Sequence, residues 1–408
     1  MAMPDYLVTI PTYWTHPGGK GEEAVLYGHP TFLDHDGTLR RTLLSLASFA
    51  ASGITVAVVA AAAHPSLAEA VETRVRQLLV SPPLPYPVLL FGASHLKALQ
   101  NFLMAHDREE HLPLLGLEGY APVRNLTLIL ANLCQAEALV SLDDDEVIAD
   151  PHFFDKITSD LATLGREHAL FGVAGIYQNG AGGVLLPEPE APCALHWPKF
   201  RWMNEAFERL ILAGPRLKPT PLAFGGNLIL PAALTRRIPF DPALPRGEDV
   251  DYVLNARCFG IPFFLDNSLA VVHLPPVGSH PVWLRLRQDL VRFAYTRLKL
   301  RCQSPREDLT PVTADELRPY PGNFLTDNLD LMAYRAHTLL AHDYLAAGDA
   351  EAAAATLHNL SLLERLNRTT DNVFTAYLRL QARWQDLLEW LSDPGVALRA
   401  QEAIWGPA

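Results

Sequence analysis

Cysteine is scarce in this chain, and long apolar runs are missing. The 408 residues include four cysteines, Cys134, Cys193, Cys258 and Cys302, and none of them is in a CxxC pair. This excludes a zinc knuckle or a disulfide framework and is typical of the reducing cytoplasm. The longest apolar run, residues 54–63, is about half of the ~20 residues needed to span a bilayer. Residues 1–9 also lack the basic start and apolar run of a signal peptide, so we expect a cytoplasmic protein.

The chain is also short of basic charge. Lysine and arginine number 33 against 45 aspartates and glutamates, which gives a formal net charge of -12. No general field therefore attracts nucleic acid, and we do not expect it as a partner. An acidic protein can still bind a polyanionic nucleotide when a divalent metal screens the phosphates. Because single domains rarely exceed roughly 250–300 residues, we expect one large domain and a smaller region.

The first 142 residues alternate between strand and helix patterns. Short β-rich or fully apolar runs are expected to be strands, namely residues 6–10, 54–60, 87–91 and 138–142. Segments with apolar residues at helical spacing lie between them, namely residues 37–51, 66–80 and 123–136. We expect the first strand to stop at Pro11, which has no backbone N–H for strand pairing. This order predicts an α/β fold with a mixed, mainly parallel sheet flanked by helices.

Two later regions have a different character. Residues 177–222 contain a glycine-rich turn, a Pro/Glu stretch and a tryptophan-rich segment, which we expect to form a flap over an acceptor site. Beyond residue 281 the strand signals vanish, and segments 282–301, 328–347, 349–366 and 371–392 have helical periodicity. We therefore divide the chain into a domain over residues 1–280 and a C-terminal α-helical region over residues 281–408.

Three consecutive aspartates follow the buried strand at 138–142. Asp143, Asp144 and Asp145 lie where parallel sheets bind ligands, beyond the carboxyl end of a strand. Carboxylates placed together repel one another, and a divalent cation is the simplest compensation. Oxygen ligands favour Mg²⁺ or Mn²⁺ over zinc, and such an ion also binds phosphate oxygens. The alternative is a solvated acidic turn or a helix N-cap.

Three further segments add candidate site residues. Gly225 and Gly226 precede Asn227 and a buried strand, so backbone can approach a ligand closely there. Glu248 and Asp249 begin a helix, whose N-terminus stabilises ionised carboxylates and suits a general base. His273 ends a strand over residues 269–272. Each has a structural alternative: a tight turn, a capping cluster and a structural histidine.

Taken in order, these segments resemble the family 2 glycosyltransferases and their GT-A relatives over residues 5–280. The resemblance rests on residues 8–13 of the first strand and loop, on Arg124 and Asn125 opening a helix, and on the acidic, glycine and histidine segments above. It implies a GT-A-like fold and a metal-dependent glycosyltransferase, and a hexose is the expected transferred sugar. The sugar would pass from a UDP or GDP sugar to an unidentified acceptor hydroxyl.

The resemblance also implies a role for each matching position. Asp249, with Glu248 beside it, would be the catalytic base, and the metal ligands would be Asp145, Asp143 and His273. The remaining positions would bind the nucleotide sugar: Pro11, Thr12, Tyr13, Arg124, Asp143, Asp144, Gly225, Gly226 and Asn227. A base at Asp249 favours inversion, although retaining relatives can carry a similar acidic motif in a binding role.

The sequence departs from the family just after the second strand. Family members usually carry an aspartate there that contacts the base, whereas residues 58–63 are all apolar. Asp34 or Asp36 from the first loop are the candidate substitutes. Two other functions therefore stay open: a sugar-nucleotide-binding protein on a degenerate transferase domain, and a metal-dependent nucleotidyltransferase. The nucleotidyltransferase would need a glycine-rich basic loop, for which Gly18-Gly19-Lys20-Gly21 is a poor match.

Two basic segments raise expectations about partners. Residues 196–218 place six basic side chains, His196, Lys199, Arg201, Arg209, Arg216 and Lys218, around Trp197 and Trp202, which suits an anionic acceptor that stacks on aromatic faces. A solvated basic helix is the alternative. Residues 283–301 combine Trp283 with five arginines, Arg285, Arg287, Arg292, Arg297 and Arg301, and with Lys299, which allows peripheral membrane contact. Packing on the catalytic domain, or a homodimer contact, is the expected role of the C-terminal helices.

Overall fold

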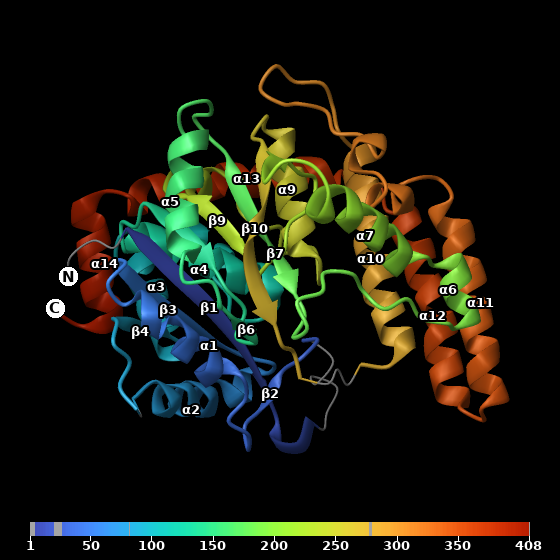
Figure 1. The fold of residues 1–408 in the computed structure, drawn as a ribbon, viewed down its shortest axis with the longest axis horizontal. Helices are drawn as coiled ribbons and strands as arrows, with labels where there is room; N and C mark the ends of the chain where they lie inside the picture. Colours follow the sequence, from blue (N-terminus) through green and yellow to red (C-terminus); the bar gives the residue numbers. More distant parts are fainter. Residues whose placement is uncertain (1–4, 20–26, 81, 277–279, 408) are drawn as a thin grey trace.

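A central mixed sheet organises the protein. The structure is a computed structural model that describes residues 5–19, 27–80, 82–276 and 280–407. Within these residues the sheet has ten strands in the order β4-β3-β1-β5-β9-β7-β10-β6, with β2 beside β1 and β8 beside β10 (Figure 1). The strands are β1 Tyr6–Thr15, β2 Thr31–Phe32, β3 Ile54–Ala62, β4 Val88–Phe91, β5 Ala138–Ser141, β6 Glu146–Val147, β7 Gly172–Gln178, β8 Leu217–Pro219, β9 Leu228–Pro231 and β10 Phe263–His273.

Helices cover both faces of this sheet and continue into a C-terminal group. They are α1 Leu39–Ser45, α2 Ala68–Val80, α3 Ala93–Met104, α4 Tyr120–Leu133, α5 Phe153–Leu164, α6 Pro192–His196, α7 Lys199–Phe207, α8 Ala232–Arg237, α9 Glu248–Cys258, α10 Val282–Arg301, α11 Leu329–Ala346, α12 Ala350–Asn367, α13 Val373–Leu391 and α14 Pro394–Trp405. The expected α/β class, with a mainly parallel sheet flanked by helices and a C-terminal helical region, is confirmed. The helix α14 was not predicted.

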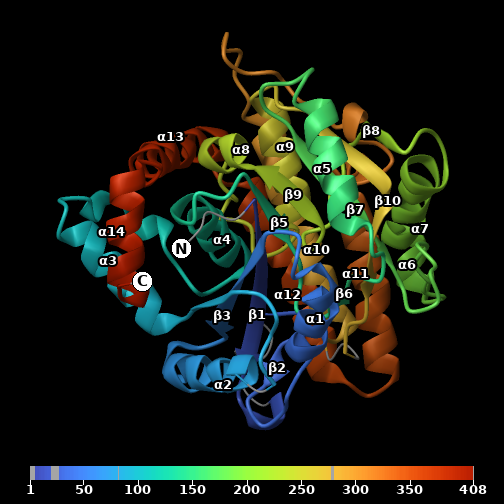
Figure 2. The same ribbon diagram turned by 60° about the vertical axis from the view of Figure 1, so that its left-hand side comes forward.

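The two faces of the sheet are separate apolar layers, because successive strand residues point to opposite sides. In β1, Leu7 packs with α4, α13 and α14, whereas Tyr6, Val8 and Ile10 pack with α1, α2 and α5. The last two helices therefore return to the sheet and complete one of its faces, as Figure 2 shows for α13 and α14 beside α3 and α4. The buried Trp384 of α13 donates from its indole N–H to the carbonyl of Thr235, 2.9 Å away.

The prediction that the first strand stops at Pro11 is wrong, since β1 continues to Thr15. In a parallel strand, the N–H and the C=O of one residue point toward the same neighbouring strand. The Thr9 carbonyl accepts from the N–H of Leu142, on the β5 side, and the Trp14 carbonyl accepts from Ala63, on the β3 side. Pro11 shares the orientation of Thr9, and β5 pairs with β1 only as far as Thr9. The missing N–H therefore faces a side where the ladder has already ended.

The segment 177–222 is tied to the C-terminal helices. It contains α6, α7 and β8, and β8 pairs antiparallel with β10. Trp197 is buried, and its ring centroid lies 4.8 Å from that of Phe324, which the Trp202 ring also contacts, at 4.6 Å. Neither tryptophan lines the cavities beside the candidate site described below. The expectation that both stack on an acceptor sugar is therefore not supported by their positions.

Most cations of the two basic segments have internal partners. In the flap, Lys199 pairs with Asp289, and Arg216 pairs with Asp160 and Asp266. In α10, carboxylates neutralise Arg292, Arg297, Lys299 and Arg301. These cations therefore bind carboxylates of the same chain, although Arg216 and Arg301 stay partly exposed. Among the described residues, no helix combines the length and apolarity needed to cross a membrane.

Candidate active site

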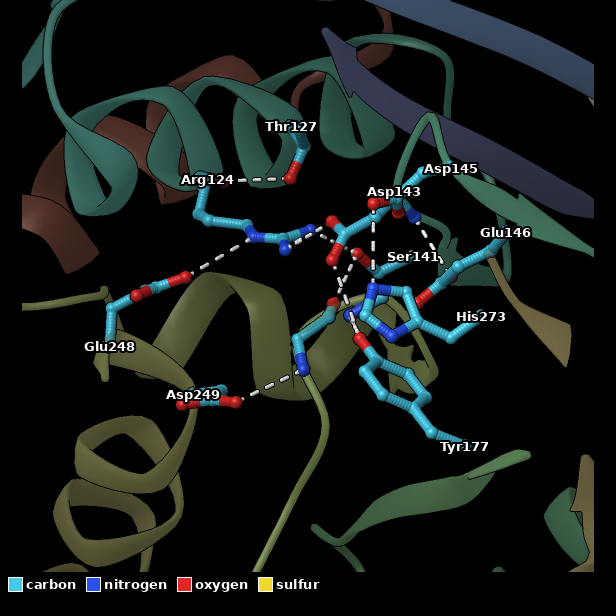
Figure 3. Close-up of polar contacts among 12 residues, drawn as sticks. Arg124, Thr127, Ser141, Asp143, Asp145, Glu146, Tyr177, Glu248, Asp249 and His273 are labelled. Carbon is cyan, nitrogen blue, oxygen red and sulfur yellow. Dashed lines mark hydrogen bonds and ion pairs between the residues drawn. The ribbon is translucent and has the colours of Figure 1, made fainter. Parts of the chain in front are cut away.

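The residues singled out from the sequence converge on one cavity of about 250 Å³ beyond the ends of β1 and β5. Nine of them line it: Tyr13, Arg124, Asp143, Asp144, Asp145, Gly225, Glu248, Asp249 and His273. Pro11, Thr12, Gly226 and Asn227 do not. Figure 3 shows Asp143, Asp145 and His273 on one side, with Glu248 and Asp249 across from them on α9. Segments more than a hundred residues apart thus meet at the edge where parallel sheets bind ligands.

The three aspartates take different partners because the chain turns immediately after β5. Asp143 accepts from Arg124 Nη2 at 2.5 Å and from the Tyr177 hydroxyl at 3.3 Å. Asp144 accepts from the Thr12 hydroxyl at 2.5 Å. Burial, with Asp145 next to it, raises the pKa of Asp144 well above its usual value. Thr12 is thus a support for this carboxyl group and not part of the cavity wall.

Asp145 and His273 form a pair across the β6–β10 edge. Asp145 Oδ2 lies 3.4 Å from His273 Nε2, and the Asp145 carbonyl accepts from the N–H of Leu274 at 2.9 Å. The Tyr177 ring stacks on His273 at 4.9 Å and fixes its plane. Burial lowers the pKa of His273, but the interaction with Asp145 outweighs burial, and the net shift is upward.

Arg124 links the two sides of the cavity from within α4. Its guanidinium is buried and donates to Asp143 and, at 2.7 Å, to the Ser141 hydroxyl, while its Nε lies 3.7 Å from Glu248. Burial alone would lower the pKa of Arg124, but the surrounding anions, Asp143 first, raise it well above its usual value. A permanent positive charge therefore sits between the acidic triplet and α9.

Gly225 and Gly226 are required because neighbouring side chains come too close to leave room for a Cβ atom. A Cβ on Gly226 would overlap the carboxylate of the buried Glu146, and one on Gly225 would lie 2.8 Å from Arg124 Nη2. The freed space lets the Gly226 N–H donate to the Tyr177 hydroxyl at 2.6 Å. Asn227 is fully buried, and its amide donates to the carbonyls of Ile176 and Leu269. Its position is that of a cross-link between β7 and β10, away from the cavity.

Glu248 and Asp249 open α9 directly after Gly247, whose φ of +79° is the left-handed conformation that glycine accepts. Asp249 accepts from the backbone N–H of Gly225 at 3.2 Å. Burial raises the pKa of Asp249, and burial together with the Asp249 charge raises the pKa of Glu248 to about 7. Carboxylates with pKa values raised toward neutrality are suited to accepting a proton at physiological pH.

Sequence reasoning missed several cavity residues. Tyr27 and Tyr120 join Tyr13 in an aromatic group, with ring centroids 4.4–5.3 Å apart. The hydroxyl of each tyrosine accepts from a backbone N–H beside the other tyrosine: Tyr27 from Gly119 at 3.0 Å and Tyr120 from Gly28 at 2.7 Å. The first loop is thereby fastened to the start of α4. Tyr177, His29, Arg246 and Arg292 also line the cavity, and only the place of Tyr177 at a strand end could have marked it.

The end of β3, which lacks the family's aspartate, borders a second cavity of about 590 Å³. Its polar side chains are Lys97 and Gln100 of α3 and Glu118 before α4. The proposed substitutes lie elsewhere. Asp34 accepts from the N–H of Gly18, and Asp36 pairs with Arg74 on the surface. Lys20 and Gly21 of the glycine-rich segment fall outside the described residues.

The donor set fits a divalent metal at Asp145 and His273. One carboxylate oxygen and one imidazole nitrogen face each other at 3.4 Å beside a second carboxylate, Asp143. Asp143 is held by Arg124, and the three side chains do not form a closed ligand cluster. Such an open site leaves positions for phosphate oxygens and water, as Mg²⁺ and Mn²⁺ sites commonly do.

Among the described residues, a tighter cluster of possible metal ligands lies elsewhere, at Glu110, His111 and Asp386. There Arg108 Nη1 already lies 3.0 Å from the Asp386 oxygen that His111 also contacts, at 2.9 Å. A resident guanidinium takes the place of a metal ion, so the cluster is explained as an ion-pair clasp between the segment before α4 and helix α13.

Sequence comparisons identify no relatives. No protein-family model matches the chain, and no curated protein matches it.

Solved structures align with most of this chain, at low identity and with TM-scores below 0.5. A mannosyltransferase, PcManGT from Pyrobaculum calidifontis in complex with GDP-Man and Mn²⁺, aligns at 16% identity and a TM-score of 0.44, covering 94% of this chain and 87% of its own. TarS of S. aureus, residues 1–349, aligns at 14% identity and a TM-score of 0.40, covering 89% and 91%. A mycobacterial protein aligns at 14% identity and 0.35, covering 72% and 75%. The function is therefore inferred from the residues of the site.

Proposed function

We propose that this protein is a metal-dependent glycosyltransferase that moves a sugar from a nucleoside diphosphate sugar to an acceptor hydroxyl. The observation that carries the proposal is the placement of two different acidic groups on one cavity. Asp145 with His273 offers metal ligands on one side, and Asp249 offers a base with a raised pKa on the other. A space between a metal–diphosphate site and a base is what sugar transfer to a hydroxyl requires.

The diphosphate of the donor would lie on the Asp145–His273 side. When bound there, Mn²⁺ or Mg²⁺ neutralises the charge that develops on the leaving diphosphate. Arg124 orients Asp143 through a hydrogen bond, and the Thr12 hydroxyl fixes the position of Asp144 in the same way. The nucleoside would extend along the Tyr13, Tyr27 and Tyr120 group. The cavity at the end of β3 would then receive the base, and its polar groups would replace the missing aspartate.

The chemical step would use Asp249 as the general base, with inversion at the anomeric carbon. The acceptor oxygen attacks the anomeric carbon while its proton passes to an Asp249 oxygen. The bond between the anomeric carbon and the phosphate oxygen breaks, and the nucleoside diphosphate leaves with the bonding electrons. The Gly225 N–H fixes the Asp249 carboxylate, and Glu248 stays bound to Arg124. Glu248 is the second candidate for the base, because it lines the same cavity.

A donor screen tests the proposal directly. Purified protein is incubated with UDP- and GDP-hexoses, with Mn²⁺, with Mg²⁺ or with EDTA, and release of the free nucleoside diphosphate is measured. We expect slow metal-dependent donor hydrolysis with one nucleotide, which EDTA abolishes. The Asp145→Asn variant should lose this activity, whereas Asp36→Asn, which removes an exposed carboxylate paired with Arg74, should keep it.

The outcomes separate the competing functions. Metal-dependent binding of a sugar nucleotide, without hydrolysis or transfer under any condition, would favour a binding protein. Pyrophosphate release from a nucleoside triphosphate and a sugar phosphate would favour a nucleotidyltransferase. Absence of nucleotide binding in the presence of either metal would refute the proposed site altogether.

A further inference from the structure

A second groove of about 580 Å³ opens directly beside the catalytic cavity. Five residues line both spaces, among them Asp249, Tyr177 and Arg246. The groove therefore ends at the carboxylate that would receive a proton from the acceptor. The groove thus offers an acceptor an approach to Asp249 from beside the cavity that holds the acidic triplet.

One wall of the groove is apolar and firmly built. Its side chains come from the segment after β7, from α7 and from the loop before β9: Val184, Leu185, Phe200, Met203, Phe207 and Phe224. Asn204 of α7 clamps the segment by accepting from the Leu186 N–H at 2.8 Å and donating to the Leu186 carbonyl at 2.9 Å. The Phe207 and Phe224 rings are 5.5 Å apart. Leu185 remains 41% exposed although it faces this groove, which leaves apolar surface available to a ligand.

The groove is also lined by three cationic side chains, Lys199, Arg246 and Arg285. Lys199 and Arg292 share one carboxylate, Asp289, at 2.8–3.0 Å. Arg246 donates to the neutral amide of Gln288 at 2.7 Å, and its charge also acts on Asp289, whereas Arg285 has no ion-pair or hydrogen-bond partner among the residues the structure describes. Both guanidinium groups line the groove, and neither forms an ion pair within 4 Å among the described residues. Arginines in this position favour a carboxylate or phosphate ligand.

We propose that the acceptor is an amphiphile that carries an anionic group. Its apolar or aromatic part would lie on the Leu185–Phe224 wall, and its carboxylate or phosphate would bind Arg246 and Arg285. Its hydroxyl would reach Asp249. This inference rests on the proposed function. It also differs from the expectation drawn from residues 196–218, because the relevant cations lie at Arg246 and on α10.

Matched small probes test both halves of the proposal. Binding of methyl β-D-glucoside, phenyl β-D-glucoside, methyl β-D-glucuronide and phenyl β-D-glucuronide is measured by ligand-observed NMR, with Mn²⁺ and the nucleoside diphosphate present. Phenyl β-D-glucoside 6-phosphate is a fifth probe that separates phosphate from carboxylate. We expect phenyl β-D-glucuronide or phenyl β-D-glucoside 6-phosphate to bind about tenfold more tightly than phenyl β-D-glucoside, because the anionic group forms charge-assisted hydrogen bonds.

Two pairs of variants assign the effect to the groove. Arg285→Gln should remove most of the preference for the anionic probe, whereas Arg287→Gln, on the same helix but bonded to Asn359 at 2.7 Å, should retain it. Leu185→Asn should weaken the phenyl preference, whereas Leu195→Asn, at an exposed leucine outside the groove, should not. Circular dichroism and thermal unfolding confirm that each variant is folded.

Equal binding of charged and neutral probes, or no binding by any of the five, overturns the acceptor proposal. An anion preference that persists in Arg285→Gln and Arg246→Gln overturns it as well. Affinity for the metal–nucleotide is measured in the same samples. If that affinity is absent while the anion preference remains, the proposed transferase function fails and the groove assignment stands.

Discussion

Removal of Lys299 should be among the most damaging single changes outside the catalytic cavity. Its ammonium group is completely buried and lies 2.8 Å from Asp251 Oδ1 and 2.8 Å from Asp241 Oδ2. Asn255 Oδ1 completes the shell at 3.2 Å. Asp251 belongs to α9, two residues after Asp249, so this cluster fastens α9, which carries the proposed base, to α10. Lys299→Met would leave two buried carboxylates without a counter-ion.

The expected cost is about 3–5 kcal/mol of unfolding free energy, the usual result of removing one partner from a buried ion pair. Urea unfolding followed by tryptophan fluorescence measures it. Arg301→Met is the matched control on the same helix, because Arg301 pairs with an exposed aspartate, Asp327. Exposed pairs contribute about 0–1 kcal/mol. A loss for Lys299→Met no larger than that of the control would refute the reasoning.

The pH dependence gives a second check with a definite sign. In the intact protein, burial raises the pKa of Asp251, whereas at Asp241 Lys299 outweighs burial and holds the pKa down. Without Lys299 both folded-state pKa values should rise above their unfolded values. Such groups stabilise the fold below the unfolded pKa, and this stability is lost as the pH rises through the folded pKa. The difference in unfolding free energy between the intact protein and Lys299→Met should therefore become smaller as the pH is lowered from about 7 to about 5.

Three further predictions concern the candidate site. Asp249→Asn should lower kcat by about 10²–10⁴, the usual contribution of a general base, and leave the Kd of the metal–nucleotide nearly unchanged. Gly226→Ala should cost about 1–3 kcal/mol in thermal unfolding, because its Cβ would overlap the Glu146 carboxylate. Asp145→Asn and His273→Ala should each raise the Kd of Mn²⁺ by at least about tenfold in calorimetric titrations with nucleoside diphosphate present.

Matched controls keep these outcomes informative. Gly180→Ala, whose Cβ would meet only a flexible leucine methyl at 3.3 Å, should be nearly neutral. Near-normal turnover of Asp249→Asn would remove it as the base and direct attention to Glu248. Unchanged Mn²⁺ affinity in both Asp145→Asn and His273→Ala would place the metal elsewhere.

Local signals were enough to predict most of the framework. An apolar run followed by Asp143–Asp145 has few structural solutions other than a buried strand ending at the edge of a sheet. The strand β5 is observed there and ends at Ser141, one residue before the predicted end. Helical periodicity predicted α10 to α13 within about three residues at each end. These properties depend on residues close in sequence, through side-chain periodicity and backbone restriction.

Contacts between distant segments decided the rest. Pro11 is tolerated inside β1 because β5 ends beside it, which depends on the length of another strand. Asn227 matched a family motif, yet its amide binds the carbonyls of Ile176 and Leu269. Trp197 suited a sugar-stacking surface in sequence and is buried against Phe324. In each case the partner lies at least forty residues away.

The sequence by itself determined that an acidic edge would form at the end of a buried strand, because strand periodicity and the run of carboxylates are local properties. Only the tertiary structure decided how the charges are shared. It buried Lys299 between two aspartates and used Arg124 to join Asp143 to Glu248. It also left Arg246 and Arg285 facing a groove. Pairing of charges depends on which helices meet, and the pattern along one helix does not contain that information.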